Sequence, residues 1–299
     1  MSSPLICIDA YGGQFWPWAL KAKIAQEVLG PDVIFPSRFM RGEFVGLDKI
    51  AEKVGDATYD ILTFSSVPLV GSFLDAIEKL GLINTLTQRD REITHRWPSY
   101  VKPEFNWRPV AVCPFNECTP DFLKSFTRSW DERIFAKTLV KKSAGHGIVI
   151  TVSELLWAHE KGLPVVETSG ESSFVNIVAD EPMIISQPIE IAEDSEKVKI
   201  EYRSWIVNHA LSSVSRYWFQ NRPIDEPEDD VLSFINSFTL AHKDVLPKHY
   251  VLDFARTKSG QLVVVEVNFF WESGIAGDAD TQGAVLNRLF TSIKQGSII

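Results

Sequence analysis

The stretch Tyr250-Val-Leu-Asp-Phe-Ala-Arg-Thr-Lys-Ser-Gly-Gln-Leu-Val-Val-Val-Glu-Val-Asn268 predicts a β-hairpin. Two runs rich in β-branched and aromatic residues flank a break at Lys258-Ser-Gly260, which is the pattern of two strands joined by a tight turn. Successive side chains of a strand point to opposite faces of its sheet. We therefore expect Val264, Glu266 and Asn268 to share one face of the second strand.

Polar side chains of this hairpin form a candidate cation site. Asp253 lies on the first strand, where it would meet Glu266 and Asn268 across the pair. Two carboxylates and an amide oxygen are hard-oxygen donors of the kind that Mg²⁺ prefers, together with waters and substrate phosphates. The alternative is an amphipathic hairpin at the margin of a sheet, with Glu266 and Asn268 in solvent.

These three residues resemble the metal-binding signature of the ATP-grasp superfamily, in which a Glu-x-Asn pair ends an apolar strand. Two more segments resemble one clade of it, named for two arginines and a lysine. The first is the Glu-x-Arg strand from Glu201 and the strand that follows it, and the second is the small-residue turn from Asn268 to Gly277. The resemblance covers about residues 97–290 and keeps the motifs in order. It implies an ATP-grasp fold of mixed α/β and α+β class.

Length and composition favour several domains. With 299 residues, 45% of them hydrophobic, the chain is long enough for about two domains with sizeable cores. We expect an N-terminal, pre-ATP-grasp-like α/β domain over residues 1–95, a central ATP-grasp lobe over 96–190, and a C-terminal lobe with the metal-binding hairpin over 191–299. The expected elements of the first domain are strands at residues 5–9, 33–35 and 61–64, a turn at 11–13, and helices at 18–29 and 69–80. In the central lobe, residues 153–161 predict a helix with Ser153 as its N-cap.

Charge and apolar patterning exclude several partner classes. The chain carries 30 basic and 39 acidic residues, a net charge of −9, which argues against a broad nucleic-acid surface. No apolar run approaches the roughly 18 residues of a membrane span, and the N-terminus lacks the pattern of a signal peptide. We expect a cytoplasmic protein with no membrane partner.

Three cysteines are present, Cys7, Cys113 and Cys118. They form neither a disulfide framework nor a Cys-x-x-Cys pair. Cys113 and Cys118 are close enough in sequence to suggest a metal site, but no second pair completes one. We interpret all three as structural thiols.

Two segments supply candidate phosphate-binding lysines. In residues 133–142 a strand carries Lys137 to its end, and a Ser/Gly-rich loop follows whose backbone N–H groups would approach a polyphosphate without obstruction. A Phe-x-Lys strand followed by a Lys-Ser pair resembles the clade, which makes Lys137 and Lys141 the phosphate ligands; a solvated hairpin is the alternative. Lys102, expected at the end of a strand, resembles the phosphate lysine of some ATP-grasp families. The main phosphate lysine is therefore open between Lys102 and Lys137.

The segment from Met183 to Glu190 predicts a strand that enters a proline-containing bend. It resembles the segment where ATP-grasp proteins hold adenine against backbone groups. An apolar strand also packs well against a purine. By this resemblance the adenine contacts are Gln187, Ile189 and Glu190.

Residues 199–217 predict two antiparallel strands joined near Asn208 and His209. Arg203 and Arg216 suit charge-assisted, often bidentate binding of phosphate or of an acyl-phosphate oxygen. The alternation of strand side chains does not bring the two arginines together unless a bulge or bend intervenes. A structural ion pair between Arg203 and a carboxylate is the alternative.

The resemblance implies an ATP-dependent carboxylate–amine ligase that uses ATP and Mg²⁺. A carboxylate would take the γ-phosphoryl group, and an amine would displace phosphate, with Lys141, Arg203 and Arg216 as catalytic residues that offset the developing charge. The substrates would be a small-molecule, peptide or protein-tail acid and an amine, and homodimers are common in the superfamily. The alternatives are phosphate transfer to another acceptor on the same fold, or a non-catalytic nucleotide-binding module.

Overall fold

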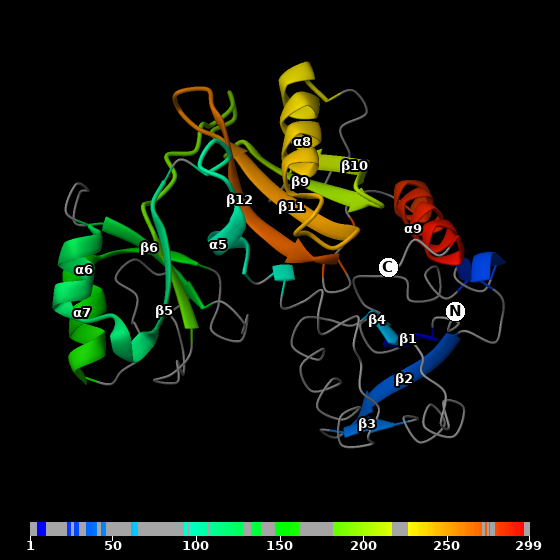
Figure 1. Ribbon diagram of the computed structural model, residues 1–299, viewed down its shortest axis with the longest axis horizontal. Helices are drawn as coiled ribbons and strands as arrows, with labels where there is room; N and C mark the ends of the chain where they lie inside the picture. Colours follow the sequence, from blue (N-terminus) through cyan, green and yellow to red (C-terminus); the bar gives the residue numbers. More distant parts are fainter. Residues whose placement is uncertain are drawn as a thin grey trace. The chain divides into compact units, whose positions relative to one another are not determined.

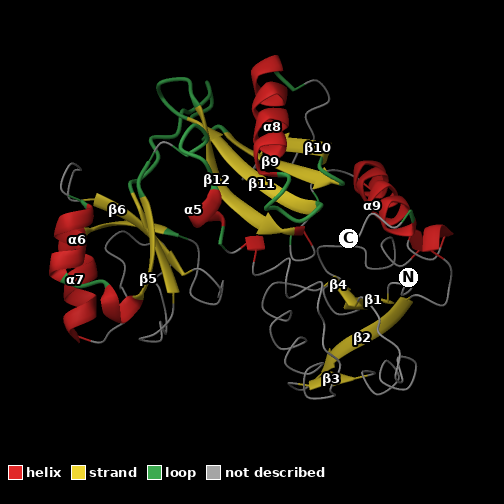
Figure 2. Cartoon of the chain, viewed as in Figure 1, coloured by secondary structure: helices red, strands yellow, loops and turns green. Residues whose placement is uncertain are grey.

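The protein is described from a computed structural model (Figure 1). The structure describes residues 5–9, 23–24, 27–29, 34–40, 43–45, 61–64, 93–94, 96–106, 108–127, 133–138, 147–161, 182–216, 227–270, 273, 275 and 279–295. The chain separates into two compact units. The central unit is Pro98–Glu190, and the composite unit joins Met1–Trp97 with Ile191–Ile299. Helices and strands both occur among the described residues (Figure 2).

The N-terminal part of the composite unit contains a sheet of the expected α/β kind. Its strands are β1 (Leu5–Asp9), β2 (Ile34–Met40), β3 (Glu43–Val45) and β4 (Ile61–Phe64), in the order β3-β2-β1-β4. Strand β1 runs parallel to β2 and β4, whereas β3 pairs antiparallel with β2. The predicted strands at 5–9 and 61–64 are confirmed, and the one predicted from residue 33 extends to Met40. The turn predicted at 11–13 and the helix predicted at 69–80 lie outside the described residues.

The central unit is an antiparallel sheet with helices on one face. Its strands are β5 (Val110–Pro114), β6 (Arg133–Thr138), β7 (Ile148–Thr151) and β8 (Pro182–Ser186), in the order β5-β8-β6-β7. Helices α6 (Pro120–Phe126) and α7 (Val152–Lys161) pack through Leu123 and Leu155 on the buried strand residues Ile134 and Ala136. Phe135 and Lys137, which alternate with these residues, therefore project from the other face of the sheet.

Two local expectations in the central unit are wrong. The sequence predicts that Ser153 caps α7, but Thr151 does so: the Thr151 hydroxyl accepts from the Glu154 N–H at 3.2 Å, and the Glu154 carboxylate accepts from the Thr151 N–H at 2.7 Å. This is a capping box, whose Thr-x-x-Glu spacing is visible in the sequence. The sequence also predicts Lys102 at the end of a strand, but residues Trp97–Tyr100 form the short helix α5, and the Lys102 carbonyl accepts backbone bonds in the turn after it.

A second antiparallel sheet forms the C-terminal part of the composite unit. Its strands are β9 (Glu201–Val207), β10 (Ala210–Arg216), β11 (His249–Arg256) and β12 (Leu262–Phe269), in the order β10-β9-β11-β12. Both predicted hairpins are confirmed. Asn208 and His209 turn the first with φ of 52° and 53°, and Gly260 turns the second with φ of 86°. These are left-handed conformations, which glycine and asparagine tolerate best.

Helices cover both faces of this sheet (Figure 1). Helix α8 (Asp229–His242) packs Phe234 and Phe238 on the rings of Phe254 and Tyr250. Helix α9 (Ala279–Lys294) contributes Val285, Leu286, Leu289, Phe290 and Ile293 to a core that also contains Trp205 and Val251 of the other face. Among the described helices, none combines the length and apolar character that a membrane crossing requires.

A buried histidine joins the first turn to β11. The Nδ1 atom of His249 accepts a hydrogen bond from the Asn208 N–H at 3.2 Å, and its ring meets the Phe270 ring edge-on. Burial, together with smaller contributions from the charges of His209 and Lys248, lowers the pKa of His249 from 6.5 to about 3. His249 is therefore neutral in the folded protein at neutral pH, which its role as a hydrogen-bond acceptor requires.

We predict that His249 makes the fold sensitive to acid. Between pH 6.5 and pH 3 the unfolded chain binds a proton that the folded protein does not, so this contribution to stability is complete above pH 6.5 and is lost as the pH falls towards 3. The expected slope reaches about 1.4 kcal/mol per pH unit. His249→Gln keeps an acceptor but does not titrate. Urea unfolding at several pH values should show a shallower acid slope for the variant, and equal slopes would contradict the prediction.

Candidate functional site

The candidate cation site lies on one face of the C-terminal sheet of the composite unit. Arg203 of β9 is directly opposite Asp253 of β11, and Asp253 is directly opposite Glu266 of β12. Asn268 pairs with Val251, which lies two residues before Asp253 and so on the same face. The register of three strands thus gathers Arg203, Asp253, Glu266 and Asn268 into one cluster, which we call the acid cluster.

Hydrogen bonds saturate much of the Asp253 carboxylate. Arg203 Nε donates to Asp253 Oδ1 at 2.8 Å, and Arg203 Nη2 donates to Oδ2 at 2.6 Å. Asn268 Nδ2 also donates to Oδ2, at 2.8 Å. The side chains of Arg203 and Asp253 are only 12% and 6% exposed. This is a buried bidentate ion pair, so the structure includes the ion pair that the sequence offered as the alternative role of Arg203.

A β-bulge shapes the hairpin beside the cluster. The pairing of β11 with β12 shifts between Asp253 and Phe254, so that Phe254 lies opposite Val264 and Val265 is the additional residue. Simple alternation places Val264 on the face of Glu266, and this expectation is wrong. Val264 is instead fully buried on the face of Phe254, which α8 covers. The bulge lets the apolar end of β12 fill one core while Glu266 stays beside Asp253.

The residues of the acid cluster fit a hard divalent cation. Asp253 and Glu266 provide carboxylates, and Asn268, whose amide nitrogen bonds Asp253, has its amide oxygen for a cation. The carboxylates of Asp253 and Glu266 carry two negative charges, and the Arg203 guanidinium carries one positive charge. The cluster therefore has a net charge of −1, which a bound cation would offset. Among the described residues no group of three or more His, Cys, Asp or Glu side chains could hold a metal ion, and Asn268 offers a third oxygen beside the two carboxylates.

The structure does not bring Arg216 to the acid cluster. A register shift occurs in the first hairpin between Leu211 and Ser213, yet Arg216 pairs with Tyr202. Since cross-strand partners share a face, Arg216 lies on the face opposite to Arg203. Its Nη2 donates to Asp194 Oδ2 at 2.9 Å, and its guanidinium lies 5.9 Å from the centre of the Tyr202 ring. A phosphate-binding role for Arg216 stays a prediction.

Lys137 lies on the face of the central sheet opposite to the face on which α6 and α7 pack. It pairs with Ile184 of β8, which pairs in turn with Val112 of β5. Phe135 shares this face and pairs with Val149 of β7. Val112 and Val149 are both 43% exposed, so an apolar surface flanks the lysine. Sequence reasoning named only Lys137 here, although the alternation along β6 also marks Phe135.

The remaining predicted nucleotide residues belong to the central unit. Gln187, Ile189 and Glu190 follow β8 directly, with Gln187 and Ile189 half-buried and Glu190 exposed. The Gln187 N–H reaches the Pro109 carbonyl at 3.5 Å. Lys102 is exposed in the turn after α5. Lys141 lies outside the described residues, so its role stays a prediction.

Gly147, at the end of the predicted phosphate-binding loop, has a packing role. A Cβ atom at this position would come within 2.1 Å of Cζ in the Phe135 ring. Such a contact is impossible without moving the ring or the strand. The position of the Phe135 ring therefore favours glycine at position 147, because any larger residue would displace that ring.

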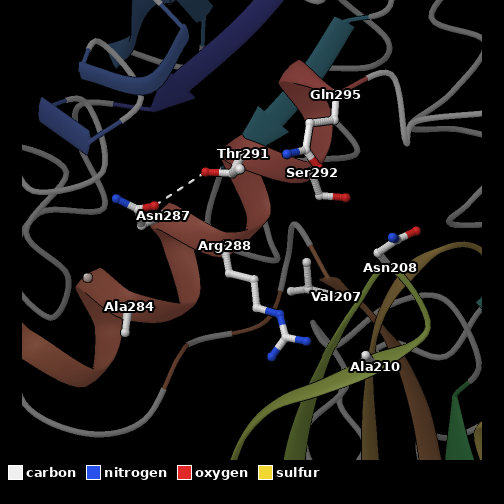
Figure 3. Close-up of a pocket in the computed structure, with 10 residues that line it drawn as sticks. Val207, Asn208, Ala210, Ala284, Asn287, Arg288, Thr291, Ser292 and Gln295 are labelled. Atoms are coloured by element: carbon white, nitrogen blue, oxygen red, sulfur yellow. Dashed lines mark hydrogen bonds between the residues drawn. The ribbon is translucent and has the colours of Figure 1, made fainter.

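A separate cavity of about 590 Å³ lies in the composite unit, between the first hairpin turn and α9 (Figure 3). Val207, Asn208 and Ala210 line it from the hairpin, and Arg288 reaches into it from the helix. Arg288 Nη1 donates to the Leu211 carbonyl at 2.7 Å. No predicted site residue lines this cavity, so the acid cluster and not the cavity guides the functional assignment.

Comparison with solved structures identifies the class of fold. D-cycloserine synthetase DcsG is similar with a TM-score of 0.61 and 12% identity, covering 99% of this chain and 100% of that one. VanG D-Ala:D-Ser ligase from Enterococcus faecalis has a TM-score of 0.55 and 12% identity, with 98% and 99% covered. The ATP-grasp ligase PsnB, in complex with a precursor variant, Mg and ADP, has a TM-score of 0.54 and 11% identity, with 97% and 98% covered. The protein has an ATP-grasp fold.

The sequence also identifies the family. Residues 111–289 match the model of an ATP-grasp domain, family 3 of the clade named for two arginines and a lysine, and the chain belongs to this family. The expected fold and clade are thereby confirmed. No curated protein matches the sequence.

We predict that two arginines paired with aspartates contribute very differently to stability. Arg203→Met leaves the buried Asp253 carboxylate without its main partner and should cost about 3 kcal/mol of unfolding free energy. Arg216→Met is the matched control. It breaks a pair whose side chains are each 32% exposed and screened by solvent, so the variant should lose much less stability than Arg203→Met. Urea unfolding of both variants checks this prediction, and similar losses of stability in the two variants would contradict it.

Proposed function

We propose that this protein is an ATP-dependent ligase that activates a carboxylate as an acyl phosphate and joins it to an amine. The acid cluster carries the proposal, because it sets two carboxylates, an amide and an arginine side by side on a sheet face. Membership of an ATP-grasp family supports the use of ATP. The similar structures include a D-Ala:D-Ser ligase and a ligase with Mg and ADP bound, which supports both the reaction class and the cofactors.

In this proposal Asp253, Glu266 and Asn268 hold Mg²⁺, which would neutralise phosphate charge when bound. Arg203 offsets the negative charge that develops on phosphoryl oxygens during transfer. The bidentate bond from Arg203 to Asp253 fixes the direction of the guanidinium, so little reorganisation is needed when charge develops.

The central unit would hold the nucleotide. Lys137 places a positive charge beside the apolar surface of Val112, Phe135 and Val149, a combination that suits a base with an attached phosphate chain. Lys137 and Lys141 are the proposed phosphate ligands, and the segment from Gln187 to Glu190 is the proposed adenine contact. Lys102 is a weaker candidate, because its turn is exposed and does not follow a strand.

We predict that ATP binding depends on Glu266. Calorimetric titration of ATP with Mg²⁺ should show saturable binding to the wild type, weakened at least tenfold in Glu266→Gln because a cation ligand loses its charge. Glu193→Gln is the control, since Glu193 is exposed and lies outside the acid cluster. Lack of binding to a folded wild type would remove the functional proposal and leave only the fold.

We predict that productive acids release phosphate only when an amine is also present, and that the product is an amide. Phosphate release from ATP over a panel of acids and amines identifies the pair, and mass spectrometry identifies the product. Arg203→Lys should lower turnover by at least tenfold while ATP binding persists, because lysine cannot reproduce the bidentate geometry. A stable phosphorylated acceptor without amide would instead assign the protein as a phosphotransferase.

A further inference from the structure

Two thiols that the proposed reaction does not use lie in contact within the central unit. Cys113 is on β5, and Cys118 follows the short helix η2 (Phe115–Glu117). Their Sγ atoms are 3.4 Å apart. Both cysteines are free and belong to the core between the sheet and helices α6 and α7, with Cys113 6% exposed and Cys118 fully buried.

The backbone on both sides holds this contact in place. Cys113 is paired with Met183 in the β5–β8 ladder. The Cys118 N–H donates to the Phe115 carbonyl at 3.1 Å, and Thr119, the next residue, caps α6 by accepting from the Phe122 N–H at 3.3 Å. Because strand pairing and a helix cap hold the backbone near both cysteines, the fold keeps their side chains close to each other.

The two thiols are not equivalent as acids. The Cys118 thiol donates to the Pro114 carbonyl oxygen at 3.6 Å, and either sulfur can be the donor in the contact between the two thiols. The hydrogen bond between the sulfurs lowers the pKa of Cys113, whereas the same bond and burial raise the pKa of Cys118. Cys113 is also the more exposed of the two thiols, so we assign the first reaction with an oxidant to Cys113.

We propose that Cys113 and Cys118 form a redox modification site that a hydroperoxide closes into an intramolecular disulfide. The two Sγ atoms are 3.4 Å apart, and a disulfide bond is about 2.0 Å long, so the sulfurs need to approach by only about 1.4 Å. The site is not a metal centre in the described part of the chain, because no further His, Cys, Asp or Glu completes a ligand group around the two sulfurs.

The chemistry takes two balanced steps. The Cys113 thiolate attacks one oxygen of the hydroperoxide, the S–O bond forms, the O–O bond breaks, and the alcohol or water leaves with the thiol proton. Cys118 sulfur then attacks the Cys113 sulfenic acid; the S–S bond forms, the S–O bond breaks, and water leaves with the Cys118 proton. Two thiols lose two electrons in all, and the hydroperoxide gains them.

The test counts thiols in the full chain, which contains three cysteines. Native protein is treated with hydrogen peroxide, unfolded and alkylated. Mass spectrometry of the intact chain then gives the number of alkylated thiols. We expect three alkylated thiols before treatment and one after it, with the count restored by dithiothreitol. Peptide mapping should place the disulfide between Cys113 and Cys118.

Three variants separate this site from accidental oxidation. In Cys7→Ser, peroxide should still remove both remaining thiols, those of Cys113 and Cys118. In Cys113→Ser, the thiols of Cys7 and Cys118 should both remain available for alkylation. In Cys118→Ser the reaction should stop at a sulfenic acid on Cys113, which dimedone labels. Three alkylated thiols after treatment, a cross-link that includes Cys7, or equally fast dimedone labelling of Cys118 in Cys113→Ser would overturn the proposal. None of these outcomes depends on ATP binding, so the ligase proposal is tested separately.

Discussion

The register of β9, β11 and β12 is the constraint on which the candidate site depends. Asp253 has a neighbour on each side in the sheet, Arg203 on β9 and Glu266 on β12. A slip of one residue in either pairing would turn a charged side chain to the face that α8 covers. The buried rings of Tyr202 and Phe254, stacked with centroids 5.0 Å apart, oppose such a slip because their burial fixes which residues face the helix.

The bulge after Asp253 reconciles two demands on the same hairpin. The face toward α8 requires a continuous apolar surface, which Phe254 and Val264 supply. The other face requires Glu266 beside Asp253. One additional residue, Val265, allows both, because it changes the alternation of β12 at a single point. A carboxylate beside a buried aspartate is thus compatible with a well-packed sheet.

The buried pair of Arg203 and Asp253 is more informative about function than about stability. Removing two charges from water costs free energy that their attraction only partly returns, so a buried ion pair is weak evidence of a stabilising role. Here the pair also bonds Asn268 and lies across from Glu266. The same charges therefore serve a fixed geometry, which suits a site that handles phosphate and a cation.

Much of the local structure could be predicted from the sequence because its signals are short-range. The Ser-Gly break at Lys258–Gly260 and the apolar runs around it predict the hairpin. The Thr-x-x-Glu capping box at Thr151 is also visible in the sequence, although the apolar pattern of the helix favours Ser153 as the cap. The helix at Trp97–Tyr100 is not predicted from the sequence. A proline at its second position is compatible with the first turn of a helix and equally with an extended segment.

Residue type, spacing and strand parity are enough to single out Asp253, Glu266, Asn268 and Lys137 as candidates from the amino-acid sequence. Their partners follow only from the folded chain. Arg203 reaches Asp253 across 50 residues of chain, while Arg216 lies on the opposite face with Asp194. Parity along one strand is a local property, but the neighbour across a sheet depends on which strands pair, in which register, and where a bulge intervenes.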